Sequence, residues 1–249
     1  MKKNTYVLSD IHGDLKALES LVDVAKIDLF NDKIIILGDV IDRGPYSLET
    51  IHYMMEYPGF KLIRGNHEEM FIKWYKNQDD SEFEKKWSLW GGRDTILRLK
   101  EMDNNNIKKM AEYILKAPYY IELDFNINGK PVLLTHTGFG FDDIVRTETG
   151  MIDCKASIEK GVNCEDIFSY MNSFDYVALP ESVIGGCLSH YMISGHVPCQ
   201  WISHSGEGCV IKTKERLFID CGCQCEENGK LAAYRLEDGK CFYVDSSLK

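Results

Sequence analysis

Residues 33–44 read Lys-Ile-Ile-Ile-Leu-Gly-Asp-Val-Ile-Asp-Arg-Gly. The first part of this stretch is apolar and rich in β-branched residues, which predicts a buried strand over Lys33–Leu37. The part that follows holds two glycines, two aspartates and an arginine, and most of these residue types are poor strand formers. The stretch therefore predicts a strand whose carboxyl end opens directly into a polar loop.

Similar junctions lie on either side of this stretch. Strands are predicted over Thr5–Leu8 and Phe60–Ile63, and each is followed by polar residues. Apolar residues at helical spacing lie between the strands, where Asp14 is expected to cap one helix and Ser47 a second helix that runs to Met55. Strands that alternate with helices are typical of an α/β fold with a parallel sheet.

The remainder of the chain predicts a helical insertion at about residues 79–117, followed by a β-rich region. The insertion follows a helix expected over Glu68–Lys76. Further strands are expected at Tyr119–Leu123, Val132–Thr135, Tyr191–Ser194, Val210–Lys212, Leu217–Ile219, Leu231–Tyr234 and Cys241–Val244, with a helix at Cys164–Met171. Because no linker or repeat interrupts the chain, we expect one α/β domain over residues 1–249, with a two-layered β core flanked by helices.

Composition limits the classes of partner. The formal net charge is −10 and no strong cluster of lysine and arginine is present, so we expect no nucleic-acid partner. No apolar run is long enough for a membrane span or a secretory signal, which predicts no membrane partner and a cytoplasmic location. The nine cysteines are therefore expected to be free thiols, and Cys221, Cys223 and Cys225 would share one face of an extended strand.

Side chains that bind metal ions gather just after the predicted strands. They are Asp10, His12, Asp39, Asn66, His136 and His196. Loops at the carboxyl ends of parallel strands line a common crevice, so we expect these side chains to converge. Oxygen and nitrogen ligands together suit two divalent ions, with Asp39 in the central loop as the natural bridge. Manganese is the favoured metal, and iron and zinc are alternatives.

The motifs resemble those of the phosphoprotein phosphatase family of calcineurin-like metallophosphoesterases, in its bacterial and phage form. The signatures GDxHG, GDxVDRG, GNHE, HGG and GHT stand here at Ser9–Gly13, Gly38–Gly44, Gly65–Glu68, His136–Gly138 and Gly195–Val197. The segments Trp90–Thr95 and Ile219–Gly222 also resemble bacterial members. Ser9, Thr137 and Val197 depart from the motif letters, and none of these departures removes a ligand.

The resemblance implies a role for each motif residue. Asp10, His12 and Asp39 would hold one ion, and Asp39, Asn66, His136 and His196 the other. His67 would protonate the leaving oxygen with Asp42 orienting it, while Arg43 and Asn66 would contact the substrate phosphate. A histidine beside a carboxylate is a suitable general acid, and the guanidinium fork of arginine fits phosphate oxygens.

A second phosphate-binding arginine is expected from the family pattern between His136 and His196. Arg146 is the one arginine in that interval, and Arg93 in the helical insertion is an alternative. Outside the motifs, Arg64 is expected to form a structural salt bridge and Glu68 to orient its loop. His52, His190 and His204 are expected to have no direct role, and Trp74, Trp87 and Trp90 to pack within the insertion.

These residues favour a metal-dependent hydrolase of phosphate monoesters, in which a hydroxide bridging two metal ions attacks phosphorus. The leading substrate is phosphoserine or phosphothreonine in a protein, and a small phosphoester is possible. A dinucleoside polyphosphate such as diadenosine tetraphosphate is the alternative, because hydrolases of that class share these motifs. A non-catalytic scaffold of the same fold is a remote third hypothesis.

Overall fold

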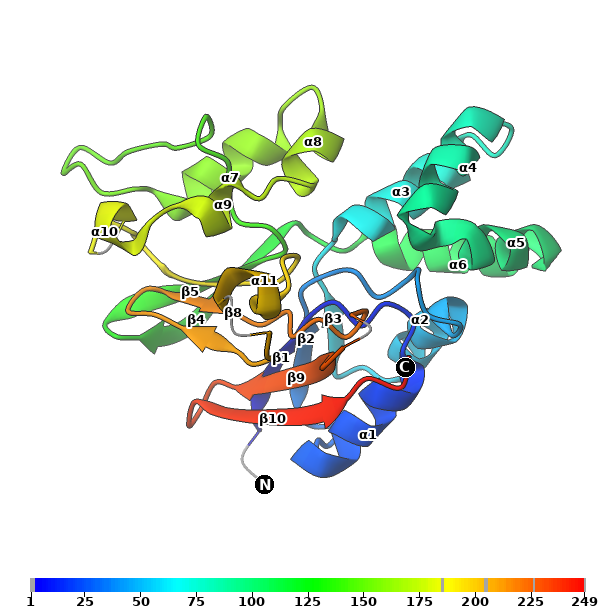
Figure 1. Cartoon of the computed structure of the whole chain (residues 1–249), viewed down its shortest axis with the longest axis horizontal. Coiled ribbons are helices and arrows are strands. Elements are labelled where there is room, and N and C mark those ends of the chain that lie inside the picture. Colours follow the sequence, from blue (N-terminus) through cyan, green and yellow to red (C-terminus); the bar gives the residue numbers. More distant parts are fainter. Residues whose placement is uncertain (1–2, 185, 204–205, 226, 249) are drawn as a thin grey trace.

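The computed structural model describes residues 3–184, 186–203, 206–225 and 227–248. Its strands form two five-stranded sheets with helices on their outer faces (Figure 1). One sheet runs in the order β10 (Lys240–Asp245), β9 (Lys230–Arg235), β1 (Thr5–Leu8), β2 (Lys33–Ile36), β3 (Phe60–Leu62). The other runs β4 (Tyr120–Ile127), β5 (Lys130–Thr135), β6 (Tyr191–Ser194), β8 (Arg216–Phe218), β7 (Ile211–Lys212). The predicted α/β fold with two β layers is confirmed.

Alternation along β2 explains why the sheets stack. Ile34 and Ile36 point into the core between the first sheet and its helices, whereas Ile35 and Leu37 point into the core between the sheets. All four are fully buried, because successive side chains of a strand face opposite sides and here both sides are covered. The apolar run that predicted the strand therefore contributes side chains to two hydrophobic cores, one on each face of the first sheet.

Helices lie on both sides of this sandwich. On the side of the first sheet lie α1 (Leu15–Ala25), α2 (Ser47–Glu56), α3 (Asn66–Lys76) and α6 (Asn104–Leu115). The helices α4 (Ser81–Trp87) and α5 (Arg93–Glu101) pack near α3 and extend away from the sheets. The second sheet is covered chiefly by α7 (Cys154–Val162), α9 (Asp175–Ala178) and α10 (Glu181–Ile184), with α8 (Ile167–Met171) and α11 (Cys199–Ser203) nearby. None of the helices in the described ranges has the length and apolarity that a bilayer crossing needs.

The helices predicted for the insertion are present, joined by a single π-helical turn, η1 (Ser88–Gly92), between α4 and α5. Within this turn Gly91 has φ +97°, and a Cβ there would lie 2.7 Å from Cγ of Arg43. π-Turns often occur at functional sites, and this one packs against Arg43, a predicted site residue.

Three local predictions are wrong. Ser47 does not cap α2; its hydroxyl accepts a hydrogen bond from the Asp42 amide and donates to the Gly44 carbonyl. The helix predicted from Cys164 begins only at Ile167, because Asp166 caps it, and α7 precedes it. Residues 221–225 form no strand. Cys221 packs between the sheets and Cys223 on the helical side of the first sheet, so the thiols do not share a face.

Candidate metal and phosphate site

The loops after β1, β2, β3, β5 and β6 meet at one edge of the sandwich. The His136 imidazole lies 2.9 Å from Oδ1 of Asn66, and the His196 amide donates to Asp10 over 3.0 Å. These contacts join segments that are 70 and 186 residues apart in the chain. The structure thus brings the predicted ligands together, as the carboxyl ends of parallel strands do in open α/β sheets.

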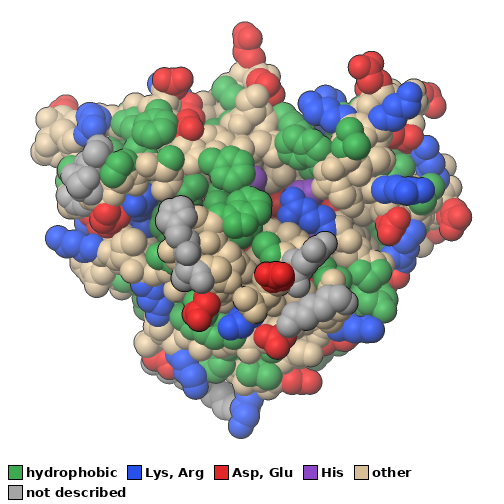
Figure 2. Space-filling view, viewed as in Figure 1, with side chains coloured by type: hydrophobic (Ala, Val, Ile, Leu, Met, Phe, Trp, Pro, Cys, Tyr) green, Lys and Arg blue, Asp and Glu red, His purple; other side chains and the backbone are tan. Residues whose placement is uncertain are grey.

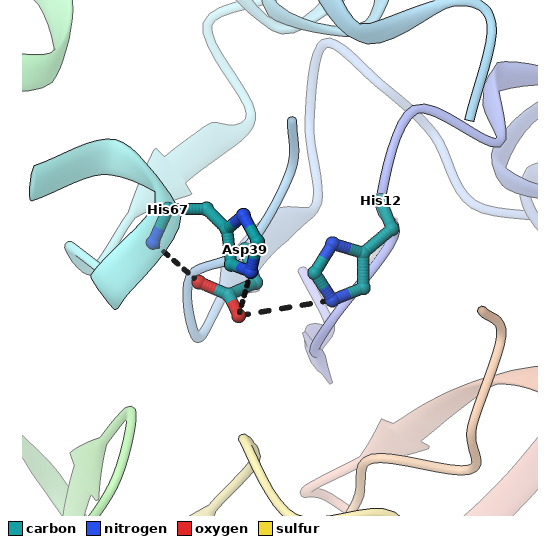
Figure 3. Close-up of side chains that lie close together, drawn as sticks. All are labelled: His12, Asp39 and His67. Atoms are coloured by element: carbon teal, nitrogen blue, oxygen red, sulfur yellow. Dashed lines mark hydrogen bonds and ion pairs between the residues drawn. The ribbon is translucent and has the colours of Figure 1, made fainter. Parts of the chain in front are cut away.

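Asp39 lies at the centre of this cluster. Its carboxylate is 3.7 Å from Nε2 of His12, 3.8 Å from Nε2 of His67 and 3.4 Å from Nε2 of His136. Figure 3 shows the His12 and His67 rings side by side, with both Nε2 atoms directed at the same oxygen, Oδ2 of Asp39. Burial works to raise the pKa of Asp39, but the surrounding imidazoles outweigh it and hold the pKa well below its usual range. Asp39 therefore carries a full negative charge inside the protein.

The backbone at the site is strained. Among the described residues nine non-glycine residues have positive φ, and six of them are predicted site residues: Asp10, His12, Asp39, Asp42, Arg43 and His196. A left-handed backbone is unfavourable for residues with a Cβ and persists where surrounding contacts fix it. Gly38, at φ +98°, permits the close approach of the next loop, because a Cβ there would lie 2.7 Å from Gly65. The tight turns aim the side chains inward.

Backbone carbonyls fix the orientation of two imidazoles. Nδ1 of His12 lies 3.0 Å from the Ile41 carbonyl, and Nδ1 of His136 lies 2.6 Å from the Leu37 carbonyl. Each Nδ1 is thus the protonated donor, which leaves the Nε2 lone pair facing the cluster. The same arrangement is common for histidines that bind metal ions.

Several polar atoms in the cluster lack a hydrogen-bond partner or face another acceptor. In the described part of the chain, Oδ1 of Asp10 and Nε2 of His196 are buried without a hydrogen-bond partner. The Nε2 lone pair of His136 faces Oδ1 of Asn66, which is also an acceptor. Burial and the charge on Asp39 raise the pKa of Asp10 well above its ordinary value. A cation among these groups would satisfy all of them, so the residues present fit divalent metal ions.

Two sets of ligand atoms lie within 4.8 Å of one another: His12, Asp39 and His67, and Asp39, His136 and His196. Asp39 belongs to both sets, which is what a bridging ligand requires. The first set contains His67 where the sequence prediction has Asp10. The assignment of ligands to each ion stays a prediction.

His67 is tied to a buried carboxylate. Its Nδ1 lies 2.7 Å from Oδ2 of Asp42, and the same oxygen accepts a 2.6 Å hydrogen bond from the indole of Trp87. Burial lowers the pKa of His67, but the Asp39 and Asp42 carboxylates outweigh it, so the net shift is upward. A raised pKa favours the imidazolium, which can donate a proton and cannot bind a metal ion. The geometry therefore suits a proton donor better than a ligand.

Arg43 supplies positive charge above the cluster. Its guanidinium lies 3.0 Å from Nε2 of His12 and 3.3 Å from Nε2 of His67, and its amide donates to the Gly91 carbonyl of the π-turn over 2.9 Å. Arg43 borders a cavity of about 240 Å³ that also exposes Asp39, Asn66 and His196, with Trp90, Phe174 and Trp201 around it. In Figure 2 histidine side chains are visible in a hollow, between hydrophobic side chains and a Lys or Arg side chain.

The other sequence-predicted residues have varied placements. The exposed Arg146 donates to the Gly150 carbonyl over 2.9 Å and does not border this cavity; its predicted contact with phosphate has no support in the geometry. Arg93 is exposed at the start of α5. Arg64 forms the predicted salt bridge, 2.8 Å from Glu69. The carboxylate of Glu68 orients its loop as predicted, by accepting from the amides of residues 39, 40 and 65.

Of the remaining histidines, His52 and His190 lie apart from the ligand cluster. His190 contacts Ser189 and Glu122, and His52 is a partly exposed residue of α2. His204 lies outside the described residues.

Three residues near the site have positions that the sequence did not predict. Trp87 packs in the insertion as expected but also donates to Asp42, and Trp90 borders the cavity with 36% of its surface exposed. Asp220 is fully buried, and burial together with Asp10 raises its pKa well above the ordinary value. The segment Ile219–Gly222 had matched a bacterial motif, which was the one signal for Asp220. An indole donor leaves no such signal in a single sequence.

Comparison with known proteins identifies the family. The model of the calcineurin-like phosphoesterase family matches residues 3–150, more than half of the chain. The chain belongs to this family. Calcineurin-like phosphoesterases are hydrolases that depend on divalent metal ions, in agreement with the donor set of the cluster.

Individual relatives differ in their substrates. The chain is 29% identical over 175 residues to the serine/threonine-protein phosphatase 4 catalytic subunit of Eremothecium gossypii, covering 68% of this chain and 50% of that protein. It is 30% identical over 66 residues to the symmetrical bis(5'-nucleosyl)-tetraphosphatase of Coxiella burnetii, covering 26% of this chain and 23% of that protein. The chain thus spans half or less of the length of these two relatives.

The fold extends to solved structures of low sequence identity. The structure of a cold-active protein-tyrosine phosphatase from a psychrophilic Shewanella species aligns with a TM-score of 0.57 at 16% identity, covering 98% of this chain and 81% of that one. At this identity the likeness concerns the fold alone. It agrees with the two-sheet arrangement described above.

Proposed function

We propose that this protein removes phosphate from phosphoserine and phosphothreonine in proteins, with two divalent metal ions, preferably Mn²⁺, bound at the Asp39 cluster. The observation that carries the proposal is that Arg43 borders the cavity beside Asp39, while its guanidinium lies 3.3 Å from Nε2 of the buried His67. One side chain brings a fixed positive charge and the other a transferable proton. The positive charge stabilises the phosphate oxygens beside the buried carboxylates, and the proton neutralises the leaving oxygen.

Metal ions held by Asp10, His12, Asp39, Asn66, His136 and His196 would supply an activated water nucleophile and polarise the phosphate oxygens. The guanidinium of Arg43 binds two of these oxygens in a planar fork. His67 then donates its proton to the leaving serine or threonine oxygen. Asp42 holds the imidazole from behind through Nδ1 and stabilises its protonated form, over 2.7 Å.

Two observations support a protein substrate over a dinucleoside polyphosphate. The protein phosphatase relative matches 68% of the chain, whereas the tetraphosphatase relative matches 26%. The cavity is rimmed by three partly exposed aromatic rings, of Trp90, Phe174 and Trp201, which can pack on the side chains that flank a phosphorylated residue. The same rings could stack on a nucleobase, so the tetraphosphatase activity is the second candidate.

We further propose that the protein acts in the cytoplasm. All nine cysteines are free in the structure, and four of them, Cys154, Cys199, Cys221 and Cys223, are buried thiols. Thiols that stay reduced are typical of a reducing compartment.

A substrate panel tests the proposal. The Mn²⁺-loaded protein is assayed with a phosphoserine peptide, a phosphothreonine peptide, a phosphotyrosine peptide and diadenosine tetraphosphate, and kcat/KM is compared. We expect the first two to be hydrolysed fastest. Faster hydrolysis of diadenosine tetraphosphate would assign the second candidate function instead. No hydrolysis of any substrate by protein shown to contain metal would favour the scaffold.

A further inference from the structure

A second cavity next to the metal site forms a groove between α3, α4 and α8. It has a volume of about 390 Å³, and its walls include Lys73 of α3, Phe83 and Lys86 of α4, and Phe168 of α8. Trp90 and Asn172 border both this groove and the metal cavity, so the two spaces are neighbours on the surface. A polypeptide whose phosphorylated residue lies at the metal site would therefore place flanking residues close to the groove.

Two lysine ammonium groups are held at this groove by aromatic rings. Nζ of Lys73 lies 4.7 Å from the centre of the Phe83 ring and 6.0 Å from that of Phe168, while Nζ of Lys86 lies 5.6 Å from the Phe168 ring. A cation over an aromatic face is attracted to the ring without losing its charge. The rings thus position both ammonium groups and leave them able to bind an anion.

No carboxylate neutralises these two lysines within ion-pair distance. The ion pairs formed within the described ranges use other lysines and arginines, and none includes Lys73 or Lys86. Asp166 also borders the groove; its carboxylate caps α8 by accepting from the Ser169 amide and hydroxyl. These hydrogen bonds, and to a smaller extent the charge of Lys86, lower the pKa of Asp166, so the groove walls carry two positive charges and one negative charge. Figure 2 shows Lys and Arg side chains, with Asp and Glu side chains among them, over the region of α3 and α4.

With two lysines and one aspartate in its walls, the groove has a small excess of positive charge, whereas the protein as a whole has a formal net charge of −10. An acidic protein repels acidic substrates at long range, so two lysines beside the site matter for which substrates approach. The aromatic floor favours the aliphatic part of a side chain and disfavours a fully hydrated ion. An extended chain with a carboxylate at the correct spacing satisfies both features.

We propose that this groove binds an acidic residue of the substrate polypeptide, close to the phosphorylated residue, through Lys73 and Lys86. The inference rests on the proposed protein phosphatase function and adds a substrate preference to it. Each exposed lysine–carboxylate pair contributes modestly, so we expect the two together to lower KM by roughly threefold to tenfold at low salt. The preference should weaken as salt rises, because screening acts on exposed charges.

The experiment compares two phosphoserine peptides that differ only in their flanking residues, Asp and Glu in one, and Asn and Gln in the other. The Mn²⁺-loaded wild-type protein is expected to show the lower KM for the acidic peptide. The double variant Lys73→Met, Lys86→Met should lose this difference and retain kcat on both peptides. Methionine keeps the length and apolar character of the lysine stem while removing its charge.

Two controls make the outcome decisive. Lys85→Met removes an exposed charge from the same helix, α4, at a position that does not border the groove, and should keep the acidic preference. Para-nitrophenyl phosphate is too small to reach the groove, so its turnover by the double variant should equal that of the wild type.

Equal KM values for the two peptides in the wild type would overturn the groove assignment, as would an equal loss of preference in Lys85→Met. If no variant hydrolyses either peptide while diadenosine tetraphosphate is hydrolysed, the proposed function itself fails. That result is distinct from a failure of the groove, in which both peptides are hydrolysed without preference.

Discussion

The indole of Trp87 offers a test of how the helical insertion controls the proton donor. Oδ2 of Asp42 accepts from both Trp87, over 2.6 Å, and His67, over 2.7 Å, and all three side chains are fully buried. Trp87→Phe removes one of these donors and keeps an aromatic ring in the cluster. The carboxylate then loses half of the contacts that fix this oxygen, so the imidazole it orients is expected to become less well placed.

The expected magnitude follows from the type of bond. A hydrogen bond to a charged group contributes about 1.5–3 kcal/mol when its loss leaves the charge buried. If about 1.4 kcal/mol of this is lost in the transition state, kcat falls roughly tenfold. The phosphate contacts proposed for Arg43 do not involve Trp87, so KM should change by less than about twofold.

Trp74→Phe is the matched control. Trp74 is also buried, packs 6.3 Å from Trp87 between ring centres, and donates its indole hydrogen to a carboxylate, Glu84, over 3.0 Å. Both variants are expected to lower the melting temperature, but only Trp87→Phe should lower kcat. The assay is steady-state hydrolysis of a phosphoserine peptide with Mn²⁺, together with thermal denaturation. A kcat that is unchanged in Trp87→Phe, or lowered equally in both variants, would refute the reasoning.

Three further predictions concern the metal site and the fold. His67→Asn should lower kcat by about a hundredfold while the bound metal measured by elemental analysis stays near that of the wild type; loss of metal would show that His67 is a ligand. Withdrawing Mn²⁺ with a chelator should lower the melting temperature, because buried carboxylates such as Asp10 lose their counter-ion, and at a hundredfold excess over Kd the bound metal would add about 2.7 kcal/mol of stability. A melting temperature independent of Mn²⁺ contradicts this. Besides capping α1, the buried Asp14 carboxylate accepts from the Ser246 hydroxyl over 3.1 Å and from the Cys223 thiol over 3.6 Å. Asp14→Ala should therefore lower the free energy of unfolding by about 2–4 kcal/mol in urea denaturation, whereas Asp103→Ala, at the exposed cap of α6, should lower it by about 1 kcal/mol. Equal losses would mean that Ser246 and Cys223 do not stabilise the Asp14 carboxylate.

The strands and the ligand cluster could be predicted because both depend on local patterns. Lys33–Ile36 is flanked by turn-forming polar residues, so the strand and its end are encoded within a dozen residues. Strand ends in a parallel sheet meet at one edge, which predicts that the loops of each sheet lie together. His136 follows β5 and Asn66 follows β3, so their 2.9 Å contact also requires the stacking of the two sheets. Asp14 likewise caps α1 as predicted, through the Ala17 amide.

Features that depend on tertiary contacts could not be predicted. Ser47 has a suitable residue type and position for a helix cap, but the turn at Asp42 uses its hydroxyl instead. Cys221 and Cys223 alternate as in a strand, yet Gly222 at φ +67° turns the chain between them, so they enter different cores. The donation from Trp87 to Asp42 joins residues 45 positions apart and leaves no periodic trace.

The order of strands has a consequence for how the protein is made. β1 lies between β2 and β9, and its residues Tyr6 and Val7 pair with Arg235 and Tyr234. During synthesis the loop that carries Asp10 leaves the ribosome early, but its strand lacks one neighbour until residue 235 has followed. A nascent chain therefore exposes an unpaired strand edge for most of its synthesis, at 5–20 residues per second or roughly 10–50 s in all. The last predicted ligand, His196, precedes β9, but the strand that positions Asp10 lacks one neighbour until β9 is present. We therefore expect truncations that remove β9 to leave this sheet incomplete and to weaken metal binding, measured by elemental analysis.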